Sequence, residues 1–233
     1  MADQKSKHDC SYWTERWEKN QIGFHKSEVH PMLLKHQEKL CANGKPKNVF
    51  VPLCGKSIDL KWLADQGIET AGLDVAKTAL EQFFTDSGLA WDEAPVPLLG
   101  ATGQLLSSKD GKLKLYCGDM MKFSSGVGGT FDAIWDRASL VALDRADIKR
   151  YAQILKSILK PGGRMMVELL QYDLSIMEDV MAGPTKPPPP FPTYEEDLKV
   201  LYEPECFVEF VDQEGRTLQG KDIVAATYLV TKK

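Results

Sequence analysis

The segment from residue 48 to residue 76 constrains this chain more than any other, because it predicts a strand, a tight turn, a helix and a second strand. Residues 49–51 are a short apolar, β-branched run, which is typical of a strand covered on both faces. The turn at residues 52–55 ends this strand, and Ser57 can cap the helix that follows. Residues 70–75 form the second apolar run. Two strands joined by a helix in this way indicate a parallel α/β unit.

A single carboxylate, Asp74, closes the second strand roughly twenty residues after Gly55, the lone glycine of the turn. Taken alone, the turn is equally consistent with an ordinary loop before a helix, and Asp74 with a surface strand end. The spacing favours a nucleoside site, in which the glycine lets backbone approach the ligand and the acid accepts from ribose hydroxyls. The turn lacks G-x-G-x-x-G, and Gly55-Lys56-Ser57 has no first glycine of a P-loop. We therefore expect a nucleoside cofactor without phosphates, of which S-adenosylmethionine is the commonest.

Composition limits the classes of protein to which the chain can belong. Its 233 residues are 43% hydrophobic and 27% charged, which suits one soluble domain with a substantial core. A net charge of -4 and a pI near 5.7 argue against nucleic acid as a partner. No run approaches the ~20 apolar residues of a membrane span, and the N-terminus lacks the apolar core of a signal peptide. Nothing in the sequence requires a dimer, so we expect a monomer.

The five cysteines are scattered and form no C-x-x-C pair; they are Cys10, Cys41, Cys54, Cys117 and Cys206. An odd number without paired spacing indicates free thiols in a reducing compartment rather than a disulfide framework. The sequence therefore predicts a cytoplasmic protein.

Helices and strands are expected to alternate along most of the chain. Helices are predicted over residues 11–42, 78–87, 148–159 and 193–202, the last two capped by Asp144 and by Thr193 with Glu196. Strands are predicted over residues 131–135, 165–170, 207–211 and 225–231, with a hairpin joining 104–107 to 112–117 and loops at 95–97, 126–129 and 187–192. This order predicts an α/β fold with a mainly parallel central sheet, helices on both faces and a C-terminal antiparallel strand pair. Residues 1–10 are expected to be flexible, and residues 11–233 to form one domain.

Two further pairs of residues follow predicted strands at the edge where open α/β sheets hold their ligands. Asp119 and Met120 come after the third strand, where an acid commonly faces the adenine amino group and an apolar neighbour covers the ring. Asp136 and Arg137 end the next strand. A surface salt bridge is the ordinary role of such an arginine, but a guanidinium in the crevice would pair with an electron-rich acceptor or a carboxylate.

Aromatic residues gather in the polar segment before the first strand. Trp13 and Trp17 are four residues apart and share a helix face, which normally indicates core packing, and Phe24 follows them. Because residues 11–42 lie outside the predicted sheet, they can also form a lid whose aromatic faces point toward a sulfonium cation. The histidines of this region match no common metal-site spacing, so no metal is expected.

The chain resembles the thiopurine S-methyltransferase family from about Trp13 to its C-terminus. The residues that carry the resemblance are W-x-x-x-W-E-x-x-x-x-G-F-H (13–25), V-F-V-P-L-C-G-K-S-x-D-L-K-W-L-A (49–64), E-Q-F-F (81–84), F-D-A-I-W-D-R-A-S-L-V-A (131–142) and P-P-P-F (188–191). The resemblance implies a Rossmann-like class I methyltransferase fold. It also implies an enzyme that moves the methyl group of S-adenosyl-L-methionine to the sulfur of aromatic or heterocyclic thiols, leaving S-adenosyl-L-homocysteine.

The resemblance also assigns site residues. It places cofactor contacts on Trp13, Trp17, Leu53, Gly55, Asp74, Val75, Asp119, Met120 and Arg137. Phe24 falls on a position that borders the substrate, and Arg216 corresponds to a substrate-facing arginine near the C-terminus. The family often has glutamate where Asp74 stands, and either acid can bridge two ribose hydroxyls. Mammalian members have serine in place of Asp119, and the acid here should still accept from the adenine amino group.

Methyl transfer from a sulfonium is an in-line displacement, so the chain's main tasks are alignment and the exclusion of water. A heteroaromatic thiol is already acidic, and no strong general base is required. Arg137 is expected to stabilise the acceptor, with Asp136 as a secondary candidate for proton handling.

Other functions remain open at this stage. The alternatives are a halide or simple-thiol methyltransferase, a catalytically silent nucleoside-binding protein, and a nicotinamide oxidoreductase, which the missing glycines disfavour. A nucleic-acid amino methyltransferase would need a polar-Pro-Pro-aromatic motif after Trp135, where Asp136-Arg137-Ala138 stands instead.

Overall fold

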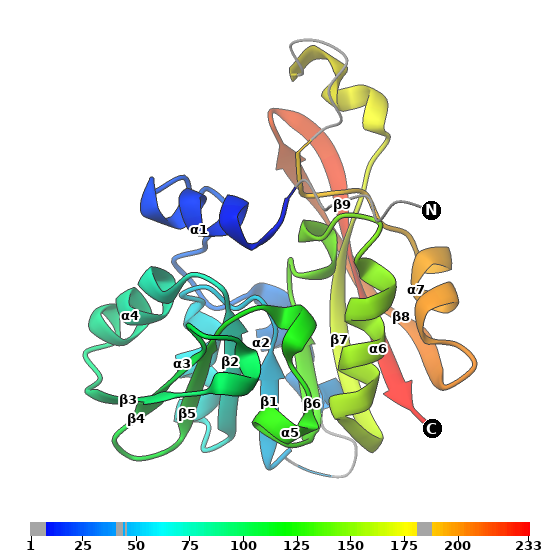
Figure 1. Ribbon diagram of the computed structural model, residues 1–233. Coiled ribbons are helices and arrows are strands. Elements are labelled where there is room, and N and C mark those ends of the chain that lie inside the picture. Colours follow the sequence, from blue (N-terminus) through cyan, green and yellow to red (C-terminus); the bar gives the residue numbers. More distant parts are fainter. Residues whose placement is uncertain (1–7, 41–43, 45, 181–187) are drawn as a thin grey trace, which may run out of the picture.

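In the part of the chain that this computed structural model describes (residues 8–40, 44, 46–180 and 188–233), one nine-stranded sheet has the order β3-β4-β5-β2-β1-β6-β7-β9-β8 (Figure 1). Its central strands are β5 (Leu113–Cys117), β2 (Glu69–Asp74), β1 (Asn48–Val51), β6 (Phe131–Asp136) and β7 (Leu159–Gln171), and each is parallel to its neighbour. The flanking strands β3 (Trp91–Pro95), β4 (Gln104–Ser108), β8 (Cys206–Leu218) and β9 (Lys221–Lys232) are antiparallel. The predicted fold class is confirmed.

Helices cover both faces of the sheet. One face carries α2 (Pro31–Leu40), α3 (Ile58–Asp65) and α4 (Lys77–Asp86), and the other carries α6 (Ile148–Ile158) and α7 (Glu195–Tyr202) (Figure 1). Strand β1 shows how the sequence divides between the two cores: Val49 and Val51 pack with α3, whereas Phe50 packs with α6. Successive side chains of a strand point to opposite faces, so an all-apolar run is required where both faces are covered.

The remaining helices are short. They are α1 (Cys10–Glu18), α5 (Ser125–Gly128) and the 3-10 turns Pro97–Leu99, Met120–Lys122, Leu140–Ala142 and Leu174–Val180. None of the helices in the described ranges is long and apolar enough to cross a membrane.

The N-terminal region differs from the single helix predicted over residues 11–42. It forms two helices, α1 and α2, and an irregular linker from residue 19 to residue 30 joins them. Asn20 adopts a left-handed φ of 53°, which ends α1, and Pro31 occupies the first position of α2, where its missing N–H costs nothing. Ala42, Asn43 and Lys45, at the predicted end of this helix, lie outside the described residues, as does Cys41.

Several predicted boundaries also shift. Residues 8–10 belong to the folded domain, because Asp9 caps α1 and His8 is buried. Pro95 ends an edge strand rather than lying in a loop, a position at which proline is tolerated. The region of residues 126–129 forms the single helical turn α5. Pro187 lies outside the described residues.

One predicted cap is confirmed and two are wrong. The Ser57 side chain accepts a hydrogen bond from the backbone N–H of Asp59 and caps α3. Asp144 does not cap α6, because the helix begins at Ile148 with Asp147 at its N-cap; the Asp144 carboxylate contacts His8 instead. At α7 the cap lies one residue later than predicted, since Asp197 accepts from the backbone N–H of Tyr194.

Candidate functional site

A cavity of about 680 Å³ opens at the carboxyl ends of β1, β2, β5, β6 and β7. This is a volume typical of small-molecule sites, at the edge where α/β sheets bind their ligands. All of the predicted cofactor and substrate residues line it, namely Trp13, Trp17, Phe24, Leu53, Gly55, Asp74, Val75, Asp119, Met120, Arg137 and Arg216. The topology therefore gathers into one site residues that are spread over most of the sequence.

The turn between β1 and α3 forms one wall of the cavity. Leu53 and Gly55 both have left-handed φ angles, of 42° and 49°. A Cβ on Gly55 would lie 2.5 Å from Cζ2 of Trp17, so the glycine is required both by its backbone conformation and by the indole that packs on it. The close approach that the sequence predicted at this turn is thus to the N-terminal helix of the chain itself.

Asp74 stands at the end of β2 and is held by the neighbouring backbone. Its Oδ2 accepts from Gly55 N–H at 2.8 Å and its Oδ1 from Ala76 N–H at 2.9 Å. Burial raises the pKa of Asp74 to about 6, and these hydrogen bonds oppose the shift. A carboxylate has about four acceptor positions, so the side chain still has lone pairs for a ligand in the cavity.

Asp119 and Met120 follow β5 at the same edge of the sheet. The Asp119 carboxylate accepts from the backbone N–H of Met121 at 2.8 Å, which fixes its orientation. The thiol of Cys10 lies beside it at the start of α1. Burial and the charges of Asp119 and Asp9 raise the pKa of this thiol to about 11, which disfavours its thiolate form.

Helix α1 and the linker lie beyond the carboxyl ends of the strands, on the side of α4 (Figure 1). The Phe24 ring packs edge-on against Trp13 and Trp17, with centroids 5.7 and 5.6 Å apart. Trp17 is buried against Ala79 and is part of a small core, whereas Trp13 is only partly buried. The indole N–H of Trp13 is buried and has no hydrogen-bond partner among the described residues.

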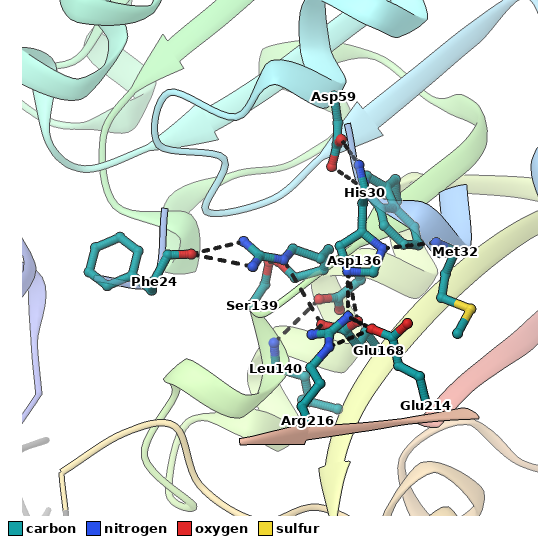
Figure 2. Close-up of polar contacts among 12 residues, drawn as sticks. Phe24, His30, Met32, Asp59, Asp136, Ser139, Leu140, Glu168, Glu214 and Arg216 are labelled. Carbon is teal, nitrogen blue, oxygen red and sulfur yellow. Dashed lines mark hydrogen bonds and ion pairs between the residues drawn. The ribbon is translucent and has the colours of Figure 1, made fainter. Parts of the chain in front are cut away.

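Arg137 connects the linker to the end of β6. Both of its terminal nitrogens donate to the backbone carbonyl of Phe24, each at 3.3 Å (Figure 2). Its Nε lies 3.9 Å from Oε1 of Glu168 and has no hydrogen-bond partner within the described part of the chain. Burial lowers the pKa of Arg137, although the charges of Glu168 and Asp59 oppose the shift.

Asp136 is the one predicted site residue that the structure keeps out of the cavity. It is fully buried, and its carboxylate accepts from the Tyr151 hydroxyl at 2.9 Å and from Leu140 N–H at 3.3 Å. Burial raises the pKa of Asp136 to about 6. Because its carboxylate faces the core under α6, the geometry gives no support to proton handling by Asp136.

A charged cluster surrounds Glu168 on β7, which lines the same cavity as the Gly55 turn (Figure 2). Arg216 donates to both Glu168 oxygens, at 3.0 and 2.7 Å, and His30 Nε2 lies 2.9 Å from Oε2. Burial alone would raise the pKa of Glu168, but the hydrogen bond from His30 and the neighbouring positive charge, including that of Arg216, lower it to about 2. Glu168 is therefore a fixed anion and a poor proton acceptor.

Asp59 closes this cluster from the side of α3. Its carboxylate accepts from the backbone N–H of His30 at 2.9 Å and from the indole N–H of Trp135 at 2.8 Å. Glu214, on β8, accepts from Nε of Arg216 at 2.6 Å. His30, Glu168 and Glu214 form the one group of metal-ligating side chains found within the described ranges, with ligand atoms within 4.8 Å of one another. The guanidinium of Arg216 contacts all three, so its positive charge stands where a cation would have to bind.

The sequence model of one protein family, Thiopurine S-methyltransferase (TPMT), matches residues 8–226. The chain belongs to the thiopurine S-methyltransferase family. A probable thiopurine S-methyltransferase of Danio rerio is 32% identical over 97% of this chain and 95% of its own length. The thiopurine S-methyltransferase of Panthera leo is 34% identical over 95% of this chain and 89% of its own length.

Solved structures of lower identity share the fold. The 1,6-didemethyltoxoflavin-N1-methyltransferase of Burkholderia thailandensis, solved with S-adenosylhomocysteine, is 14% identical and has a TM-score of 0.60 over 96% of this chain and 87% of its own. The N-methyltransferase NodS of Bradyrhizobium japonicum, also solved with S-adenosylhomocysteine, is 14% identical with a TM-score of 0.58 over 94% and 97%. The α/β fold predicted from the sequence is thus that of known methyltransferases.

The sequence reasoning assigned no site role to Glu168, Asp59 and His30, although Asp59 stands inside the motif at residues 49–64. These three residues come from β7, from α3 and from the linker before α2. A glutamate inside an otherwise apolar strand (M-M-V-E-L-L) is the one signal that could have pointed to this cluster, because a buried charge needs partners. Its partner Arg216 was assigned only by resemblance, and the linker that carries His30 was expected to be helical.

Proposed function

We propose that this chain transfers the methyl group of S-adenosyl-L-methionine to the sulfur of aromatic or heterocyclic thiols such as thiopurines. One observation carries the proposal: a single cavity is lined both by Asp74 and the Gly55 turn, which suit a nucleoside, and by Arg137 and Arg216. Family membership gives this cavity its reaction class.

The cavity has the donors and acceptors that the cofactor needs. Asp74 retains lone pairs for the two ribose hydroxyls, and Asp119 can accept from the adenine amino group. The buried indole N–H of Trp13, which has no partner in the described part of the chain, is a donor that a ligand can satisfy. Acidic side chains outnumber lysines and arginines among the residues that line the cavity, which suits a cationic sulfonium and disfavours the pyrophosphate of a nicotinamide dinucleotide.

When bound, S-adenosyl-L-methionine supplies the methyl group and its own leaving group. The chain contributes alignment and exclusion of water: Trp13, Trp17 and Phe24 cover the cavity, and Arg137 holds the linker that carries Phe24. Neither Glu168, which is a fixed anion, nor the buried Asp136 is suited to act as a base. An acceptor that is already acidic therefore fits the site best, and we propose that the reaction needs no metal.

The finer expectations about assembly and location are also proposals. We propose a cytoplasmic monomer that acts on small molecules and binds neither nucleic acid nor membranes. The net charge of -4 supports the exclusion of nucleic acid. The free cysteines Cys10, Cys54, Cys117 and Cys206 support a reducing compartment.

The test is a methyl-transfer assay over thiopurines, other thiols, halides and phenols, together with thermal unfolding in the presence of S-adenosylhomocysteine or NAD. The proposal expects methylation of aromatic and heterocyclic thiols, and a rise in melting temperature with S-adenosylhomocysteine alone. Preferential methylation of halides or alkyl thiols would favour a halide or simple-thiol methyltransferase. Stabilisation by S-adenosylhomocysteine with no turnover of any acceptor would favour a silent binding protein.

A further inference from the structure

The arginine that the family resemblance assigns to the substrate is already engaged. Arg216 places its fork on the two oxygens of Glu168 at 3.0 and 2.7 Å, and its Nε donates to Glu214 at 2.6 Å. A guanidinium offers five N–H donors in a fixed plane, and both of its bidentate edges are used here. Arg216 therefore has no remaining pair of N–H donors for a carboxylate carried by an acceptor.

Arg137, the second arginine beside this cluster, is also close to Glu168. Its Nε lies 3.9 Å from Oε1 of that carboxylate, and its terminal nitrogens are occupied by the carbonyl of Phe24. The side chain of Glu168 is only 3% exposed, so water screens its charge weakly. One buried anion thus faces both of the arginines that could attract a negatively charged substrate (Figure 2).

The other charged groups near Glu168 do not add an excess of positive charge. Asp59 and Glu214 add carboxyl groups next to His30 and Arg216. The linker contributes His25, Lys26 and Glu28 to the lining of the cavity, of which Lys26 and Glu28 are opposite in sign. Around Glu168, carboxyl groups are therefore at least as numerous as lysines and arginines.

From this arrangement we propose that Glu168 is a specificity residue, which makes the site select thiols that carry no permanent anionic group. The proposal rests on the proposed function and names its acceptor class: neutral heteroaromatic or aromatic thiols and thiones. A carboxylate on the acceptor ring would either lie beside Glu168 or displace it from Arg216. The first places two like charges in a buried site, and the second leaves Glu168 buried without its partner; both are costly.

A matched pair of acceptors tests this directly. The compounds 4-mercaptobenzamide and 4-mercaptobenzoate have the same ring and differ by one negative charge. We would measure their equilibrium binding to the protein saturated with S-adenosylhomocysteine by calorimetry, and their kcat/KM with S-adenosylmethionine, both corrected for the ionised fraction of each thiol. The wild type should prefer the amide by about tenfold or more in both measurements, given the cost of juxtaposed like charges.

Glu168→Gln should remove most of this preference, because it keeps the shape of the side chain and frees Arg216 for the carboxylate. Glu214→Gln, at the more exposed side of Arg216, should shift the ratio in the same direction by less. Glu69→Gln is the control: it makes the same chemical change at the amino-terminal end of β2, far from the cavity, and should leave the ratio unchanged.

Equal binding of the two compounds to the wild type would overturn the proposal, even if Glu168→Gln does not fold. A ratio that shifts as much in Glu69→Gln as in Glu168→Gln would also overturn it, because net charge alone would then explain the effect. If binding shows the expected preference but neither thiol is methylated, the specificity inference stands and the proposed reaction fails.

Discussion

The guanidinium of Arg137 holds the backbone carbonyl of Phe24 with both terminal nitrogens, each at 3.3 Å (Figure 2). This contact joins the end of β6 to the linker between α1 and α2, across 113 residues of sequence. Because Phe24 in turn packs against both Trp13 and Trp17, the same arginine fixes the aromatic cover of the cavity. A residue expected to act on the acceptor therefore also holds the linker that lines the cavity.

Arg137→Lys should lower kcat/KM by roughly tenfold, because one ammonium cannot reproduce two directed hydrogen bonds from a planar fork. The two bonds to Phe24 are long, so their net contribution to stability is about 1 kcal/mol and the melting temperature should fall by only about 2–4 °C. Steady-state kinetics and thermal unfolding of the same preparation check both. A variant that melts much earlier but has normal activity per folded molecule would make Arg137 purely structural.

Asp74→Ala should weaken binding of S-adenosylhomocysteine by about 1.5–3 kcal/mol, the usual range for hydrogen bonds to a charged group. Calorimetric titration measures this loss. The variant also removes the acceptor for Gly55 N–H and Ala76 N–H, so circular dichroism must show that the turn still folds. Unchanged affinity in a folded variant would show that Asp74 does not contact the ribose.

The affinity for S-adenosylhomocysteine should also depend on pH through Asp74. Its pKa of about 6, raised by burial, means that the carboxyl is largely protonated at pH 5 and ionised at pH 7. Ribose hydroxyls donate to the ionised form, so affinity should rise about tenfold between these pH values and then level off. Asp74→Asn should bind with a flat profile. The same slope in both proteins would assign the titration to another group.

The residues that could be predicted from the sequence are those whose chemistry is local to a strand end. Gly55, Asp74 and Asp119 each follow an apolar run directly, and parallel strands deliver their carboxyl ends to one edge. The role of Glu168 could not be predicted in this way, because it depends on a contact with Arg216, which lies 48 residues away in the sequence and on the far side of β9. Asp136 lies outside the cavity for a related reason: adjacent residues at a strand end point in different directions, and the sequence alone does not show which of Asp136 and Arg137 lines it.

The linker illustrates a second limit of sequence patterns. The helical spacing of Leu33, Leu34 and Leu40 predicts one helix that extends back to residue 11, but only residues 31–40 form that helix. The intervening residues are held by tertiary contacts instead. Arg137 holds Phe24, and Asp59 accepts from the backbone of His30. Such contacts override local propensity.

If α1 and the linker act as a lid, ligand should slow amide hydrogen exchange in residues 11–25. Protection should be strongest around Trp13, whose indole N–H has no partner among the residues that the structure describes, and weaker around Trp17, which is already packed against Ala79. Exchange measured by mass spectrometry with and without S-adenosylhomocysteine checks this. Equal exchange in the two states would assign the whole segment to the static core.

Asp136→Asn should change how stability depends on pH. The pKa of Asp136 is about 6 in the folded chain against an ordinary value of 3.8, because burial disfavours its charge. Between these two values the unfolded chain releases the proton before the folded one, so the wild type loses stability as pH rises from about 4 to about 6, by up to about 3 kcal/mol. Below this window both states are protonated, and above it the loss is complete.

The asparagine cannot ionise, so the difference in unfolding free energy between the two proteins isolates this group from Asp74 and Glu168, which titrate in both. Urea unfolding should be measured at pH 4.5, 5.5, 6.5 and 7.5. The unfolding free energy of the variant minus that of the wild type should increase up to about pH 6 and keep a constant offset above it. That offset contains the whole titration loss together with any difference in the hydrogen bonds that Tyr151 and Leu140 make to the two side chains. A difference that stays constant from pH 4.5 upward would mean that the buried carboxyl is already ionised at low pH, with the Tyr151 hydroxyl and the Leu140 N–H compensating its burial.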